Sequence, residues 1–149
     1  MSKADTCHTV MVKGNPVKGE YSSAVIVTVG MVVQLDSLYQ LALSSVATPI
    51  YGGGEQVVTE APERGKGIYS SGTVENTYAV GEHVPTIAPY SGCEVLALLT
   101  SGQTITRGGL LEVAATGKVI AAAGTNVAKF RALESLSPSQ DALIWAMRV

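Results

Sequence analysis

The residues of this chain that could bind a metal or act as a nucleophile are two cysteines and two histidines. Cys7 and His8 are adjacent, and His83 precedes Cys93 by a short interval. Thiolate and imidazole are ligands that zinc prefers, but the Cys-x-x-Cys and His-x-x-x-His spacings that preorganise a site do not occur. His83 and Cys93 could in principle form a base and thiol nucleophile. Cys93 follows a Pro-Tyr-Ser-Gly turn, a setting typical of a small buried hydrophobe, so we expect no catalytic residue and no metal site.

Glycine-rich loops offer a second kind of chemistry, the binding of phosphate groups. Two Gly-Lys pairs occur, one at Lys66 and one at Lys118. A phosphate-binding loop needs a glycine five residues before the Gly-Lys pair and a Ser or Thr after it. Glutamate occupies the first position in both cases, and Gly67 and Val119 follow the lysines. We therefore interpret the glycines as turn residues and expect a protein that is not an enzyme and holds no cofactor.

The composition limits the class of protein that carries these residues. Of the 149 residues only 15% are charged, whereas an average soluble domain has about 25%. The net charge of −2 lacks the basic excess that neutralises phosphates, so we expect no direct nucleic-acid binding. No apolar run reaches the roughly 20 residues of a spanning helix, so we expect no membrane contact. A chain this poor in charge, with a mean hydropathy of +0.27, is expected to bury part of its own surface in contacts with other subunits.

Short apolar runs separated by turns make up most of the chain. Residues 24–29, 94–99 and 110–113 are rich in Val, Ile and Leu, and residues 142–149 alternate between two faces. Turn signals every 8–12 residues favour an all-β sandwich or barrel. Residues 38–46 permit a helix, but their Ser and Thr neighbours are poor helix formers, and we predict a strand there.

Charge is distributed unevenly along the chain. The first 20 residues mix charges with a Gly-Asn-Pro turn and show no helix or strand period, so we predict an N-terminal arm over residues 1–20. A single β-barrel domain is predicted over residues 21–149. Within it, residues 21–54 hold one charged residue, Asp36, so we expect part of this segment to be covered by a neighbour. The remaining dense charge cluster, residues 60–66, is predicted to be a surface loop.

Several motifs, taken in order, resemble those of a known family. They are GMVVQLD at residues 30–36, EAPERGKGI at 60–68, YAVGE at 78–82, EVLALL at 94–99 and GQTITRGGLL at 102–111. This order is similar to that of the head decoration, or cement, proteins of tailed bacteriophages. The resemblance covers roughly residues 25–149.

The resemblance implies a small β-barrel or β-tulip-like domain with an extended arm, which binds the outer surface of an assembled icosahedral capsid and stabilises it. The implied partner is the major capsid protein, the implied oligomer is a trimer, and the implied location is the virion, after synthesis in the host cytoplasm. The candidate capsid or subunit contacts are the charged and turn residues of the arm and the loop: Lys3, Asp5, Lys13, Asn15, Pro16, Lys18, Glu60, Glu63, Arg64 and Lys66.

Two alternatives stay open at this point. One is another phage structural β-barrel protein, such as a tail, head-completion or minor shell component. The other is a lipoyl- or biotinyl-like carrier domain. The glycine and leucine rhythm of residues 102–110 resembles that of carrier domains, and Lys118 lies in about the hairpin that carries their modified lysine. The residues before Lys118 depart from the carrier pattern.

Overall fold

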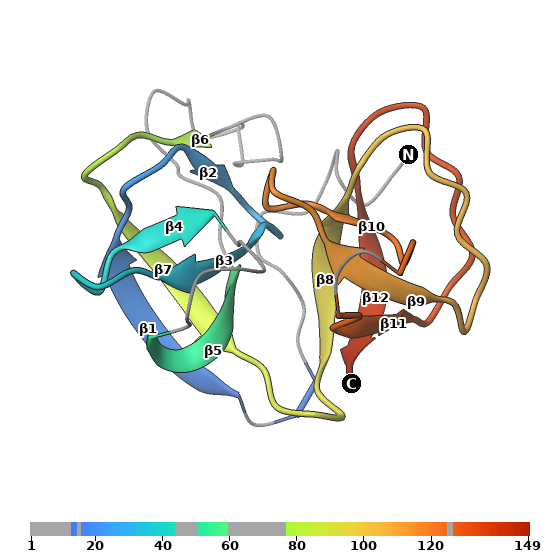
Figure 1. The fold of residues 1–149 in the computed structure, drawn as a ribbon, viewed down its shortest axis with the longest axis horizontal. Helices are drawn as coiled ribbons and strands as arrows, with labels where there is room; N and C mark the ends of the chain where they lie inside the picture. The colour runs from blue at the N-terminus through green and yellow to red at the C-terminus, as the bar shows by residue number, and fades with distance from the viewer. Residues whose placement is uncertain (1–12, 15, 44–50, 60–76, 125–126) are drawn as a thin grey trace, which may run out of the picture.

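A computed structural model describes residues 13–14, 16–43, 51–59, 77–124 and 127–149. These residues form strands and turns, and none of them lies in a helix, so the predicted all-β class is confirmed (Figure 1). No helix that could span a membrane is found in the described ranges. The strands, in chain order, are β1 (Val17–Ser22), β2 (Val27–Thr28), β3 (Val32–Leu35), β4 (Leu41–Leu43), β5 (Tyr51–Val58), β6 (Thr77–Tyr78), β7 (His83–Ala88), β8 (Glu94–Leu99), β9 (Leu110–Val113), β10 (Val119–Ala121), β11 (Phe130–Ala132) and β12 (Ala142–Arg148).

The first seven strands form what we call the sheet lobe, on the left of Figure 1. Five of them make one antiparallel sheet in the order β1-β7-β5-β3-β4, and β2 pairs with β6 in a short ribbon. A bridge between Ser23 and Leu41 joins the two edges of the five-stranded sheet at one end. The sheet is therefore curled toward closure, which buries its inner face without a second layer of helices.

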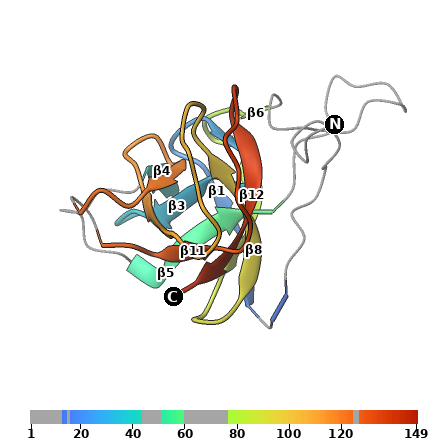
Figure 2. The same ribbon diagram turned by 90° about the vertical axis from the view of Figure 1, so that its right-hand side faces the viewer.

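The last five strands form the barrel lobe, a closed barrel in the order β10-β8-β12-β11-β9. Figure 2 views the molecule from this side. The β8–β12 pair is the longest, running from Leu99 opposite Ala142 to Glu94 opposite Met147. The alternation predicted for the last strand is seen in its second half, where Ile144 and Ala146 are fully buried and Trp145 between them is only partly buried, but Leu143, predicted on the same face as Trp145, is buried as well.

The two lobes share one hydrophobic core, which runs from Val27 to Ala146. Gly30 lies at the junction: its N–H donates to the Val58 carbonyl at 2.8 Å, and its carbonyl accepts from the Leu98 N–H at 2.8 Å. A Cβ at Gly30 would clash with the Leu143 side chain, so only glycine fits between β8 and the sheet lobe. The sheet lobe is thus bonded directly to the edge of β8.

The structure corrects the predicted boundary of the arm at residue 20. Strand β1 begins at Val17 and pairs with β7 through Ser22, so the last four predicted arm residues belong to the sheet. The sequence pattern missed β1 because it is an edge strand: Val17, Lys18 and Glu20 are all exposed, so there is no alternation of buried and exposed residues. The rest of the predicted arm, apart from residues 13, 14 and 16, lies outside the described residues.

Two further expectations differ from the structure. The closed barrel comprises residues 94–148 and not the whole of 21–149, since the earlier strands form the sheet lobe. The strand predicted at residues 38–46 is limited, among described residues, to Leu41–Leu43. Leu38 and Tyr39 form a turn instead, in which Tyr39 has a φ of +57°. Their side chains are apolar but point to solvent, so hydrophobicity alone predicted the wrong element.

Candidate functional site

Three turns meet at one end of the sheet lobe, and we call residues 22–26, 36–40 and 79–82 the turn end. Ser23 and Ala24 link the three segments. The Ser23 N–H donates to the Glu82 carbonyl at 3.0 Å, the Ser23 carbonyl accepts from the Gly81 N–H at 2.7 Å, and the next N–H, of Ala24, donates to the Leu41 carbonyl at 2.9 Å. In Figure 1 these turns lie on the left, on the side of the sheet lobe away from the barrel.

The turn end exposes four large hydrophobic side chains. Ile26 is 62% exposed, Leu38 73%, Tyr39 61% and Val80 63%. Single exposed hydrophobics are common on soluble proteins, but a group of them is typical of an interaction surface. The backbone hydrogen bonds of Ser23 and Ala24 connect the turns that carry these side chains. The group is therefore a feature of the fold and not of a single loop.

The carboxylate of Asp36 fixes the conformation that presents two of these side chains. Its Oδ1 accepts from the Leu38 N–H at 2.8 Å and from the Gln40 N–H at 3.0 Å, while the Asp36 carbonyl accepts from the Tyr39 N–H at 3.0 Å. These bonds hold the left-handed backbone of Tyr39, which non-glycine residues adopt rarely. Leu38 and Tyr39 are consequently kept outside the core.

Three carboxylates lie in the turn end or on the neighbouring strand. Asp36 lies within one turn, and Glu82 lies within another, where its Oε1 accepts from the Ala79 N–H at 2.7 Å. Glu20 in β1 is exposed, with its Oε1 4.0 Å from Nδ1 of His83 at the start of β7. The turn end therefore combines exposed apolar side chains with nearby carboxylates.

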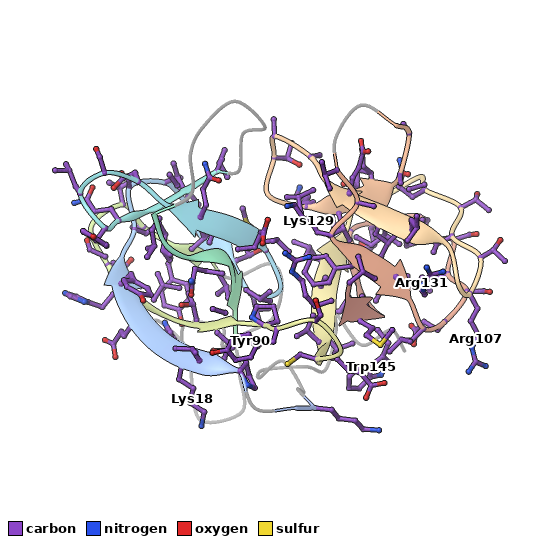
Figure 3. The ribbon with its side chains drawn as sticks, turned by 60° about the horizontal axis from the view of Figure 1, so that its bottom comes forward. Lys18, Tyr90, Arg107, Lys129, Arg131 and Trp145 are labelled. Atoms are coloured by element: carbon purple, nitrogen blue, oxygen red, sulfur yellow. The ribbon has the colours of Figure 1, made fainter. Side chains whose placement is uncertain are left out.

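A basic surface lies on the barrel lobe, and we call Arg107, Leu110 and Arg131 the basic face. Arg131 in β11 is directly opposite Leu110 in β9, and both side chains are exposed. An Nη1 hydrogen bond to the Gly108 carbonyl, 2.8 Å long, holds Arg131 beside the turn that contains Arg107. Of the carboxylates in the described ranges, none is within 4 Å of either guanidinium. Figure 3 shows both arginines on the barrel side of the molecule, far from β1.

A buried ion cluster joins the two lobes. The Glu55 side chain in β5 is 7% exposed, and its two carboxylate oxygens contact Nζ of Lys129 at 3.0 Å and Nη2 of Arg148 at 2.9 Å. Burial raises the pKa of the Glu55 carboxyl, but the Lys129 hydrogen bond and the two positive charges outweigh it and hold this pKa below its usual value. The Arg148 guanidinium also lies 5.9 Å from the Phe130 ring centroid. Each carboxylate oxygen already has a cationic partner, so we assign the cluster a structural role.

The structure places few of the predicted contact residues. Lys13 is exposed, and its backbone N–H and carbonyl exchange hydrogen bonds of 2.9 and 3.0 Å with Glu94 at the edge of β8. Pro16 directly precedes β1, and Lys18 is exposed on β1 (Figure 3). The other predicted contacts lie outside the described residues: Lys3, Asp5, Asn15, Glu60, Glu63, Arg64 and Lys66.

The candidate base and nucleophile lie far apart in the structure, and the candidate carrier lysine is held in an ion pair. His83 is exposed at the start of β7, whereas Cys93 is buried beyond its far end. A strand of six residues rises about 3.3 Å per residue, so the two side chains are too far apart to form a base and nucleophile. No cluster of three metal-ligating side chains occurs within the described ranges, and Cys7 and His8 fall outside them. The Lys118 amine forms an ion pair of 2.7 Å with Asp141, which does not favour the carrier alternative.

Sequence reasoning missed the turn end and the basic face as sites. The charge-poor segment 21–54 contains Ile26, Leu38 and Tyr39, but its composition did not indicate which of its residues are exposed. Val80 and the arginines carry no comparable signal in the sequence, because only the fold brings their segments into place.

Comparisons with known proteins give a structural similarity but no match to a sequence family. No protein-family model matches the chain, and no curated protein matches it. The solved N base of the head fiber gp8.5 of bacteriophage phi29 is 12% identical, with a TM-score of 0.46, over 91% of this chain and 98% of that chain. These values are too low for the comparison to support a functional assignment.

Proposed function

We propose that the protein is a structural component of a bacteriophage virion, which binds the outer surface of the assembled icosahedral capsid as a symmetric trimer. The observation that carries this proposal is the group of four exposed hydrophobic side chains at the turn end, in a chain with 15% charged residues, which indicates a protein that works in contact with other subunits, whether copies of itself or of the shell. Apolar surface with a polar margin is the composition of protein interfaces. The ordered motifs that resemble decoration proteins supply the kind of assembly, with the major capsid protein as the partner.

In this role the protein acts by binding alone and breaks no covalent bond. A protein that binds the assembled shell but not its dissociated subunits stabilises the shell in proportion to RT ln(1 + [L]/Kd). The gain per site is modest, about 2.7 kcal/mol at a hundredfold excess over Kd, but it is repeated at every symmetric position. We therefore expect shell stability to rise with added protein until the sites are filled.

The decisive experiment mixes the purified chain with capsids that lack it and images the particles by electron cryomicroscopy. The expected result is density at symmetric positions on the outer surface, with a higher temperature of shell rupture. The control is the same capsids without added protein. Absence of density at symmetric positions would overturn the proposal, and density confined to a tail or to one vertex would favour the alternative of a tail or head-completion protein.

A further inference from the structure

We propose that copies of this chain associate head to tail, with the turn end of one copy bound to the basic face of the next. The inference deepens the proposed function, because it names the surfaces that would build the trimer, and it rests on that function only for the number of copies in the ring. The occupant of the turn end is thus a second copy of this chain.

The two surfaces are complementary in composition. The turn end presents exposed apolar side chains with two carboxylates nearby, those of Glu20 and Asp36. The basic face presents an exposed leucine, Leu110, opposite Arg131, with Arg107 in the adjoining turn, and neither arginine has a carboxylate partner within the described part of the chain. Contact between apolar side chains would supply affinity, and the opposite charges would set the orientation and the rate of encounter.

The two surfaces lie on different lobes of the molecule (Figures 1 and 3), so each can contact a different neighbouring copy. A contact between two different surfaces is heterologous, and it produces a closed ring when successive rotations return to the start. A rotation of about 120° per copy closes the ring at three. Each copy then has its turn end and its basic face covered.

Two variants separate the surfaces. The turn-end variant carries Leu38→Ser and Tyr39→Asn, since asparagine tolerates the left-handed backbone at this position. The basic-face variant carries Arg107→Glu and Arg131→Glu. All four side chains are exposed, so both variants should fold, which circular dichroism checks. Light scattering after size exclusion should show a trimer for the unmodified chain and a monomer for each variant, with affinity reduced about 100-fold or more.

Matched controls exist on the same chain. Tyr90 is 60% exposed, almost the same as Tyr39, but it lies in the turn between β7 and β8. Lys18 is an exposed cation on β1, away from the basic face (Figure 3). Tyr90→Asn and Lys18→Glu should both keep the mass of the trimer. If these controls dissociate as readily as the two variants, the surfaces named above are not the interface and the inference is wrong.

Mixing the two variants gives the sharpest result. Each variant keeps one intact surface, and the two intact surfaces are the complementary ones, so an equimolar mixture should form a 1:1 dimer and grow no further. A mixture that stays monomeric, or an unmodified chain that is itself monomeric, overturns the inference. The capsid experiment is read separately: a trimer that fails to decorate shells refutes the proposed function alone, whereas a monomer that decorates them refutes this inference alone.

Discussion

Glu55 shows how one side chain can join two parts of a molecule. It belongs to β5 of the sheet lobe, yet its partners Lys129 and Arg148 belong to the barrel lobe. Removing one member of a buried ion cluster leaves the others without compensation, which costs more than the cluster contributes as a whole. The residue is therefore a sensitive probe of contact between the lobes.

Replacing Glu55 by Gln should lower the free energy of unfolding by about 2 kcal/mol at pH 7, the contribution of hydrogen bonds to charged groups. The folded-state pKa of Glu55 is lowered, so its stabilising effect is complete above the unfolded pKa, about 4.3, and is lost as the pH falls through the folded value. Urea unfolding between pH 7 and pH 3 should show the two proteins converging in acid. Glu20→Gln, at an exposed carboxylate, is the control, and parallel curves for Glu55→Gln would contradict the assignment.

A single methyl group added at Gly30 tests how tightly the junction of the lobes is packed, and the same change at Gly102 is the control. Both have a positive φ, +83° and +80°, so alanine at either position costs about 1–2 kcal/mol for the backbone. A Cβ at Gly30 would also clash with Leu143 and lie 3.1 Å from the Leu98 nitrogen, whereas Gly102 has no atom within 4 Å of that position. Gly30→Ala should therefore cost about 1–3 kcal/mol more than Gly102→Ala in chemical denaturation. Equal losses of unfolding free energy would show that the side chains around Gly30 rearrange to accept the methyl group, and would contradict the prediction.

At the scale of the element, the edge strand β1 decides where the arm can be cut. Deleting residues 2–12 keeps the Lys13 bridge to Glu94 and all of β1, so the unfolding midpoint should not change. Shell binding should weaken about tenfold, or 1.4 kcal/mol, if the predicted contacts Lys3 and Asp5 are used. Deleting residues 2–22 removes β1 and leaves the edge of β7 unpaired, so this chain should aggregate. Thermal melts and shell co-sedimentation measure both effects, and unchanged shell binding after the shorter deletion would refute the arm hypothesis.

Elements buried on one or both faces could be predicted from the sequence, whereas elements defined by exposure could not. Strands β8 and β12 are apolar runs between turns, and they lie where the sequence pattern predicts strands. Strand β1 and the turn at Leu38 and Tyr39 break the rule that apolar residues lie inside, so periodicity misassigned both. The turn end depends on three segments distant in sequence, and backbone hydrogen bonds of Ser23 and Ala24 that no local pattern encodes bring them together.

At the scale of the whole molecule, the barrel lobe depends on residues outside it to complete the hydrogen bonds along one side of β8. Strand β10 pairs with β8 only at Leu99, and the same side of β8 is bonded to Lys13 at Glu94 and to Gly30 at Leu98. Since an open strand edge and an uncovered apolar face both favour aggregation, the closed barrel is not expected to be a stable unit by itself. The two lobes should unfold together.

Cutting the chain in the turn between β7 and β8 tests this dependence directly. The fragment of residues 91–149 contains every strand of the barrel, but it loses the partners of β8 and is near the size of about 60 residues at which a domain is marginally stable. Trp145 is the single tryptophan of the chain and reports on the packing of β12. Its fluorescence in the isolated fragment should match that of the unfolded chain, and it should return to the native spectrum when the fragment of residues 1–90 is added. A native spectrum for the isolated fragment would instead show two independent domains, and the single domain predicted over residues 21–149 would then be wrong.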